Sequence, residues 1–474
     1  MGSSVLPMRT LTQSGTNRPS LVASLAGTGG IVVLIAAAAS IGIILANGSW
    51  LYLALVIAVV IALQWPVEAA LGVYAFLFPF ESIAMLGNSA SGGMSVNRVL
   101  GAVAAMALLA TGIVTKRLHW PSRPAWWWTA FVAWCAISAV WALQLQPVLK
   151  LLPTAVSLLA LYLVAVSWKL TKEQYSFITK CVIAGALLAA LFVIYQYRGG
   201  VTYKTWFGDS TGRASLVAGE REANPNHFGA DLLLPFSLAV GLFFSAKKKL
   251  NMLLSLGVAG AIALAAFLTM SRGALLSVMV VVAVYVFHLG IRRRMLLVGA
   301  ALLAALLAMP SNFFSRITTS LATGGAGRVD IWIASGHLIK KYALLGAGLS
   351  NFPVAYNEFA GRAPLFRGFG RGAHNIYLEA FVELGVVGFV LLLAAAASHL
   401  RLLRKMRLAR SERTMQVLAL EAACWATLVN GFFEGGIWYK SFWLVWTLCL
   451  VLAGLIETKA EEPALEASAA AAWN

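Results

Sequence analysis

A histidine and an asparagine, His374 and Asn375, stand where a basic segment meets a long apolar run. A neutral imidazole accepts a proton near pH 7, so histidine is the usual general base when a hydroxyl group must be activated. The preceding segment, Arg367-Gly-Phe-Gly-Arg371-Gly-Ala, is spaced by glycines and could wrap a diphosphate. The residue type alone leaves a second interpretation open, in which His374 starts a helix and bonds a backbone carbonyl.

Arg272 is a second candidate for chemistry, because it lies between two strongly apolar runs. An arginine in such surroundings is costly and is a functional candidate by default. The alternative is that its side chain snorkels to the membrane interface. The adjacent Gly273 allows another backbone or a ligand to approach closely.

The segment 311–374 is rich in positive charge, against which stand only Asp330 and Glu358. Its cations are Arg316, Arg328, Lys340, Lys341, Arg362, Arg367 and Arg371. Two interpretations stay open, namely binding of anionic lipid headgroups and handling of a substrate that bears phosphate. Arginine suits phosphate because its planar guanidinium donates two parallel hydrogen bonds and keeps its charge.

Composition indicates which elements must position these residues. The 474 residues are 60% hydrophobic and only 11% charged, whereas a soluble domain carries about a quarter charged residues. In lipid the backbone must satisfy its own hydrogen bonds, as helices or as a closed barrel. The apolar runs, such as 250–270, are continuous rather than alternating, which favours helices. We therefore predict an all-α integral membrane protein.

The basic residues predict the orientation of the chain, since they recur in every second loop and cytoplasmic loops are rich in lysine and arginine. The clusters are Arg9 and Arg18; Lys116, Arg117 and Arg123; Lys169 and Lys172; Lys247, Lys248 and Lys249; Arg292, Arg293 and Arg294; and Arg401, Arg404, Lys405, Arg407 and Arg410. Both termini are then cytoplasmic and the number of spans is even. We predict about 12 transmembrane helices, with about 14 as the alternative, because some early apolar windows such as 50–65 are short.

The whole chain, 1–474, is predicted to be one polytopic membrane domain. The apolar run from Ile31 is interpreted as a retained signal anchor. Two long loops, 197–226 and 311–374, are expected on the periplasmic face. Within the second, apolar residues at helix-like spacing over 330–345 predict one or two amphipathic helices on the outer face, with Asp330 near the start and Gly346 at the end. The tail, 458–474, is rich in alanine and glutamate and is predicted to be disordered and cytoplasmic.

Neither a metal site nor a nucleotide site is predicted. The four cysteines, Cys135, Cys181, Cys424 and Cys449, lie inside apolar runs without metal-type spacing, which is typical of buried inert thiols. The sequence contains no CxxC, HExxH, Walker or GxGxxG motif. The outer face offers no cluster of acidic or histidine ligands, so we expect no cofactor and no nucleic-acid partner.

Several of these motifs resemble those of one known family. His374-Asn375, followed by nine residues and then Gly385-x-x-Gly388, resembles the H[N/S/Q]-x9-G-x-x-[G/T/Y] signature of bacterial O-antigen ligases. The segment that begins at Arg272 resembles their R-x3-L signature. The wider superfamily, which includes O-antigen polymerases and protein O-oligosaccharyltransferases, is resembled by SRGAL at 271–275, by GRVDIW at 327–332 and by GAGLSNF at 346–352.

The resemblance implies a glycosyltransferase of the GT-C type in a bacterial inner membrane, with a periplasmic active site. The donor would be an O-antigen linked to undecaprenyl diphosphate, and the acceptor a sugar hydroxyl of lipid A–core oligosaccharide. No metal would be used, and the other partners would be membrane lipids. Two alternatives stay open. One is an O-antigen polymerase, and the other is a lipid-linked oligosaccharide transporter, which the charge gathered on one face disfavours.

Within this reaction we expect Arg272 and Arg328 to stabilise the developing phosphate charge, and His374 to take the proton of the acceptor. Attack from the opposite face would invert the anomeric centre. The residues predicted to bind substrate are Arg213, Arg367, Arg371 and Asn375. The acids that could orient or replace the histidine are Asp231, Glu379 and Glu383. The histidines expected to tolerate alanine better are His227 and His337.

Overall fold

The structure is a computed structural model that describes residues 61–86, 94–204, 210–309, 327–409 and 413–471, together with Phe313 and Ser315. The chain divides into two compact units, 1–64 and 65–474. The second unit contains every candidate site residue. Most of the apolar window at 50–65 and the signal anchor predicted from Ile31 lie outside the described residues.

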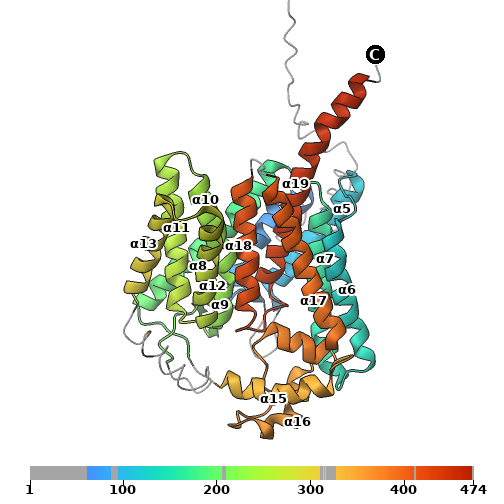
Figure 1. Cartoon of the computed structure of the whole chain (residues 1–474), viewed down its shortest axis with the longest axis vertical. Helices are drawn as coiled ribbons and strands as arrows, with labels where there is room; N and C mark the ends of the chain where they lie inside the picture. Colours follow the sequence, from blue (N-terminus) through green and yellow to red (C-terminus); the bar gives the residue numbers. More distant parts are fainter. Residues whose placement is uncertain are drawn as a thin grey trace, which may run out of the picture. The chain divides into compact units, whose positions relative to one another are not determined.

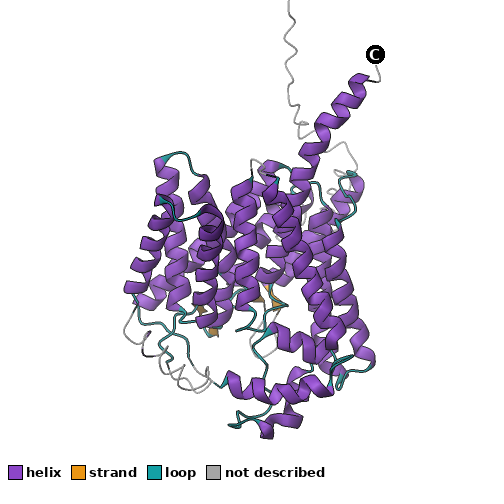
Figure 2. Ribbon diagram, viewed as in Figure 1, coloured by secondary structure: helices purple, strands orange, loops and turns teal. Residues whose placement is uncertain are grey.

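The described part of the second unit is almost entirely helical (Figure 2). Its helices are η1 (Pro66–Leu71), α4 (Gly72–Leu77), η2 (Phe78–Phe80), α5 (Val96–Val114), α6 (Arg123–Ile137), η4 (Ser138–Val140), α7 (Leu145–Ser167), α8 (Lys172–Arg198), α9 (Pro225–Asp231), α10 (Leu233–Ser245), α11 (Lys249–Leu268), α12 (Arg272–Leu289), α13 (Arg293–Leu307), α15 (Arg328–Lys341), α16 (Phe352–Phe359), η5 (Ala360–Arg362), α17 (Ile376–Leu408), α18 (Thr414–Asn430) and α19 (Lys440–Ala471). Two antiparallel hairpins pair β1 (Met85–Leu86) with β2 (Met94–Ser95), and β3 (Val217–Ala218) with β4 (Arg221–Glu222).

Seven helical segments of the described residues are long and apolar enough to cross a membrane, as an all-α membrane protein requires. They are Val96–Val114, Leu145–Ser167, Lys172–Arg198, Pro225–Ser245, Lys249–Leu268, Arg272–Leu289 and Ile376–Leu408. Shorter apolar helices are Pro66–Phe80 and Lys440–Ile456. The total of about 12 or about 14 spans stays a prediction.

The helix α19 extends into the C-terminal tail and ends at Ala471. Alanine and glutamate are both strong helix formers, so a helix that is already formed propagates through them at little cost. The disordered cytoplasmic tail expected at 458–474 stays a prediction.

Small residues let the helices around the site approach closely. A Cβ on Gly241 of α10 would lie 2.9 Å from the Cβ of Ala419 on α18. A Cβ on Gly273 of α12 would lie 2.8 Å from the Cβ of Phe433, just beyond α18. Glycine removes this clash and so permits close backbone packing. The start of α12, with Arg272, therefore lies against the segment 431–439 that joins α18 to α19.

The helix α17 is broken at Gly385, whose φ of 67° and ψ of −170° are not helical. A break inside a membrane helix frees backbone groups that need other partners. The N–H groups of Ala347 and Gly348 supply them, donating to the carbonyls of Val382 and Glu383 at 2.8 Å each. A Cβ on Gly385 would lie 2.0 Å from a backbone oxygen of the neighbouring segment, so this position requires glycine. Gly385, the first residue after the nine-residue spacing, thus allows the chain between α15 and α16 to pack on α17.

That outer layer consists of α15 and α16, which lie across one end of the helices (Figure 1). α15 occupies most of the stretch 330–345 but begins at Arg328 and ends at Lys341. Asp330 is therefore in the first turn, and Gly346 lies beyond the end. Apolar residues of α15, α16 and α17 share one buried core that includes Leu338, Phe352 and Val382.

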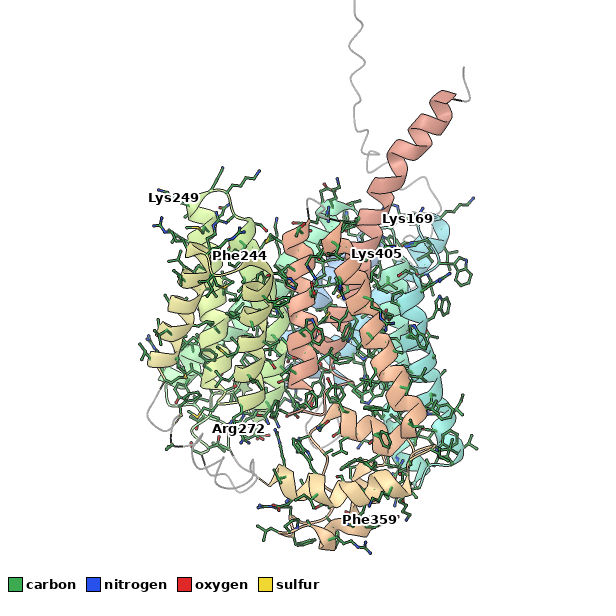
Figure 3. All side chains as sticks on the ribbon, viewed as in Figure 1. Lys169, Phe244, Lys249, Arg272, Phe359 and Lys405 are labelled. Atoms are coloured by element: carbon green, nitrogen blue, oxygen red, sulfur yellow. The ribbon has the colours of Figure 1, made fainter. Side chains whose placement is uncertain are left out.

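The labelled cations separate along the helices. Figure 3 shows Lys169, Lys249 and Lys405 at one end, and Arg272 and Phe359 at the other. The lysines used to infer the cytoplasmic side thus share an end, and the candidate site lies at the opposite end. The assignment of these ends to the cytoplasm and the periplasm stays a prediction.

Cysteine labelling tests this orientation. Single cysteines at 210–220 and 345–370 should react with an impermeant maleimide in whole cells, and those at 118–122, 248 and 405 only after permeabilisation, because basic loops stay cytoplasmic. The background is low since Cys135, Cys424 and Cys449 are buried, and Cys181 can be replaced by serine. Labelling of 345–370 from the cytoplasm alone would overturn both the topology and the location of the site.

Candidate active site

The centre of the site is a buried carboxylate, Glu434, whose side chain is 4% exposed. It lies in the segment 431–439 between α18 and α19. His227 of α9 places its Nε2 3.0 Å from Oε1 of Glu434. His374 places its Nδ1 3.6 Å from the same oxygen. Arg328 at the start of α15 places its Nη2 3.7 Å from the other oxygen, Oε2. One carboxylate thus gathers side chains from three separate elements.

The charge of this carboxylate is maintained by the two histidines. Burial alone would raise the pKa of Glu434, but the hydrogen bonds and charges of His227 and His374 outweigh burial and lower the pKa to about 2. Glu434 is therefore ionised at every physiological pH. An ionised carboxylate accepts hydrogen bonds and does not donate them, so it fixes the direction of each contact.

The backbone conformation of His374 and the hydrogen bonds of the next two residues fix its position. Its backbone φ of 50° lies in the left-handed region, where residues other than glycine are uncommon and often functional. The side chain of Asn375 caps α17, accepting from the N–H of Tyr377 at 3.0 Å and of Leu378 at 3.1 Å. The N–H of Ile376 donates to the carbonyl of Gly431 at 2.8 Å, which ties the start of α17 to the segment of Glu434.

This placement selects the reactive nitrogen of the imidazole. Nδ1 of His374 faces Glu434, and 46% of the histidine side chain is exposed. If Nδ1–H donates to the carboxylate, Nε2 carries the lone pair and is open to a substrate. A histidine oriented by a buried carboxylate is the arrangement that general-base catalysis uses.

Arg272 and Arg328 supply positive charge beside this histidine. Arg272 is half-buried and has no hydrogen-bond or ion-pair partner among the residues that the structure describes. Burial lowers the pKa of Arg328, the nearby Arg272 lowers it further, and Glu434 opposes both. The two guanidinium groups are therefore close enough to repel each other, and one carboxylate balances only one of them. The excess positive charge favours an anion at this place.

The other predicted substrate-binding arginines have protein partners. Arg213 is buried, donating from Nε to the carbonyl of Thr269 at 2.7 Å and from Nη2 to Asn226 at 2.5 Å. It thereby ties the loop before α9 to the turn before Arg272. Arg367 pairs with Asp330 at 2.6 Å. Arg371 is exposed and donates from Nε to the carbonyl of Arg367 at 2.6 Å.

Of the three acids considered as partners of the histidine, Glu379 lies beside it and interacts with both His374 and Glu434, and the other two lie elsewhere. Glu383 accepts from the N–H of Ser350 at 2.8 Å and of Phe352 at 3.1 Å, so it caps the start of α16. Glu379 interacts with the backbone of His374. Asp231 interacts with Ser441 and Lys440. The carboxylate that faces the imidazole is Glu434, which the sequence interpretation did not include.

His227 is the second residue that the sequence interpretation set aside. It bonds Glu434, and the hydroxyl of Tyr439 bonds its Nε2 as well. Two local signals point to these residues in retrospect. His227 lies at a helix start, after Asn224-Pro225, and His374 also lies at a helix start, before Asn375. Glu434 is a lone acid between two apolar windows.

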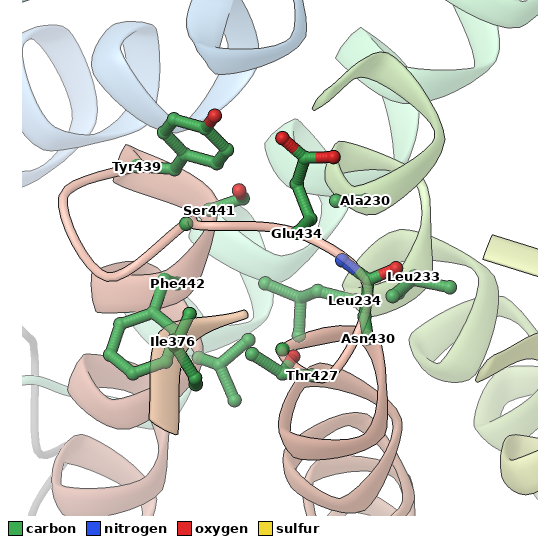
Figure 4. Close-up of a pocket in the computed structure, with 13 residues that line it drawn as sticks. Ala230, Leu233, Leu234, Ile376, Thr427, Asn430, Glu434, Tyr439, Ser441 and Phe442 are labelled. Atoms are coloured by element: carbon green, nitrogen blue, oxygen red, sulfur yellow. The ribbon is translucent and has the colours of Figure 1, made fainter. Parts of the chain in front are cut away.

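A small pocket with a volume of about 20 Å³ opens beside Glu434 (Figure 4). Glu434 and Tyr439 lie at one end, and Ile376 and Thr427 at the other. Among the described residues, no group of three histidine, cysteine, aspartate or glutamate side chains could hold a metal ion.

Residues 236–393, about a third of the chain, match the model of a family described as O-antigen ligase. This match supports a relationship of the chain with the O-antigen ligase/polymerase superfamily. The matched segment contains Arg272, Arg328 and His374 but neither His227 nor Glu434. The family covers both ligases and polymerases. No curated protein matches the sequence.

The position of Glu434 predicts a loss of activity on Glu434→Gln. The amide keeps the size of the side chain but removes the charge that orients the imidazole, so turnover should fall on the order of tenfold. Glu434→Asp should recover part of it.

An acid titration measures what the charge of Glu434 contributes to stability, apart from its effect on turnover. Because folding lowers the pKa of Glu434 from 4.5 to about 2, its charged form stabilises the fold above pH 4.5 and this stabilisation is lost as pH falls toward 2. Wild type should lose more thermal stability over this interval than Glu434→Gln. Unchanged turnover in the variant would exclude Glu434 from the site.

Proposed function

We propose that the protein is an O-antigen ligase, a glycosyltransferase of the GT-C type that acts at the periplasmic face of a bacterial inner membrane. It transfers O-antigen from undecaprenyl diphosphate to a sugar hydroxyl of lipid A–core oligosaccharide, with inversion. The observation that carries the proposal is the contact of His374 with the buried Glu434 beside two arginines. One of them, Arg272, has no partner among the residues that the structure describes. This arrangement supports activation of a hydroxyl next to a bound diphosphate.

In the proposed step, the acceptor oxygen attacks the anomeric carbon of the donor sugar and its proton passes to Nε2 of His374. The bond between the anomeric carbon and the phosphate oxygen breaks, and its electron pair leaves with undecaprenyl diphosphate. Arg272 and Arg328 stabilise that negative charge. A diphosphate is already a good leaving group, so no general acid is required. Glu434 stabilises the imidazolium that forms.

Reconstitution tests the proposal. The purified protein is placed in liposomes with undecaprenyl-diphosphate-linked O-antigen and rough lipopolysaccharide, without nucleotide. Extension of the lipopolysaccharide supports a ligase. Lengthening of the undecaprenyl-linked chains alone would identify a polymerase, and movement of the donor across the bilayer without transfer would identify a transporter.

The same assay tests metal independence. We expect EDTA to leave turnover unchanged, because arginine charges take the place that a divalent ion would occupy at the diphosphate. The control adds excess Mg²⁺ after EDTA. Loss of activity with EDTA and recovery with Mg²⁺ would show a metal requirement, and Asp231 and Glu379 would be the first ligands to examine.

A further inference from the structure

A second polar cavity lies beside the candidate site and has a volume of about 320 Å³. Its walls come from the starts of α5 and α19, from α7, and from the chain around η2 and β2. The lining residues that bear on its chemistry are Glu81, Ser95, Asn97, Arg98, Trp438 and Lys440. None of them is used by the proposed reaction.

Asn97 is the first indication of a ligand. It is 1% exposed and lines the cavity, yet neither its amide nitrogen nor its amide oxygen has a hydrogen-bond partner in the described part of the chain. A buried amide without partners is costly, and such groups are rare in folded proteins. A ligand with hydroxyl groups would satisfy both atoms, since the amide donates from one side and accepts on the other.

The charge of the cavity is the second indication. Lys440 is buried and is bonded to Glu81 and, at 3.1 Å, to the hydroxyl of Ser95, so its charge is balanced. The guanidinium of Arg98 bonds the hydroxyl of Thr154, a neutral group. Arg98 pairs with no carboxylate among the described residues. The cavity therefore keeps one positive charge, on a group that binds phosphate and carboxylate well.

The cavity shares a wall with the candidate site. Trp438 and Lys440 line the cavity, while Tyr439 between them bonds His227. One short segment thus faces a general-base site on one side and a polar cavity on the other. A saccharide held in the cavity would lie against the segment whose Tyr439 bonds His227.

We propose that this cavity binds an anionic sugar, one that bears a phosphate or a carboxylate, of the acceptor glycolipid. The inference rests on the proposed function. The donor diphosphate is assigned to Arg272 and Arg328, which leaves a second anion site for the acceptor. Arg98 takes the negative group, Asn97 takes sugar hydroxyls, and the cavity selects acceptors by the charge of a sugar that does not react.

Binding to the full-length protein in detergent tests this inference. The probe is a fluorescently labelled lipid A–core glycolipid, used intact, after phosphatase treatment and after reduction of its carboxylates. Arg98→Ala and Asn97→Ala should each weaken binding of the intact probe roughly tenfold, as for a lost hydrogen bond to a charged or buried group. The matched control is Arg362→Ala, an exposed arginine on the outer layer whose guanidinium stacks on Phe359.

The modified probes identify the anion. Weaker binding of the phosphatase-treated or the carboxyl-reduced probe to wild type, with no further loss in Arg98→Ala, supports the inference and names the group. Equal binding of all three probes overturns it. Asn97→Ala should fold as stably as wild type because it removes an unpartnered amide, and weaker binding together with a lower melting temperature would indicate a structural role instead.

Different outcomes overturn the acceptor-site inference and the ligase proposal. Transfer by wild type with binding that is unaffected in both variants overturns the inference alone. Charge-dependent binding that is lost in both variants, without transfer by wild type, overturns the ligase proposal alone.

Discussion

Replacement of His374 by alanine should lower transfer of O-antigen on the order of 10³-fold, while donor binding largely survives. The loss follows because Nε2 of His374 is open to a substrate, whereas Nε2 of His227 already bonds Glu434 and Tyr439. Donor binding survives because the diphosphate is assigned to the arginines. The measurements are turnover with core acceptor and, separately, binding of labelled donor.

Two further variants make this result specific. His374 has a φ of 50°, which alanine tolerates poorly and asparagine tolerates better. His374→Asn should therefore fold well and stay inactive. His337→Ala is the matched control. His337 lies on the outer layer and stacks on Phe359, with the ring centroids 5.7 Å apart. Near-normal turnover of His374→Ala would refute the general-base role. Loss of donor binding in step with turnover would make His374 a diphosphate ligand.

Replacement of Arg272 by alanine should leave the enzyme nearly inactive, since one preorganised donor is often worth on the order of 3 kcal/mol in the transition state. Arg272 has no protein partner among the described residues, so its removal breaks no hydrogen bond or ion pair in that part of the fold. Arg272→Lys keeps the charge but loses the planar fork, and it should stay impaired. Turnover is measured at saturating donor, with expression checked in the membrane.

The comparison with Arg362→Ala controls for charge, because that variant removes an exposed arginine from the same face. It should retain normal turnover. Equal losses in both variants would point to the general positive field of the outer face and not to Arg272. Normal capping of lipopolysaccharide by well-expressed Arg272→Ala would remove this residue from the site.

Some features of this protein are set by its local sequence, and others by its tertiary structure. The sequence by itself determined the helical membrane class, because a chain with 11% charged residues cannot cover a soluble surface. It also placed His374 and Asn375 at the start of an apolar helix, because a helix start is a local event with local signals. It could not say that Gly385 breaks this helix, or that close contact with Leu344 and Gly346 requires glycine there.

Only the tertiary structure decided the partners of these residues. His227 and Glu434 are 207 residues apart, and no periodic pattern relates them. The packing of α12 on α18 through Gly273 brings the segment of Glu434 to Arg272, and the anchoring of α15 brings Arg328 to the same carboxylate. Polar contacts between distant elements depend on how the apolar faces of the intervening helices pack. That packing is a property of the whole chain, so the local sequence around Glu434 carries little trace of it.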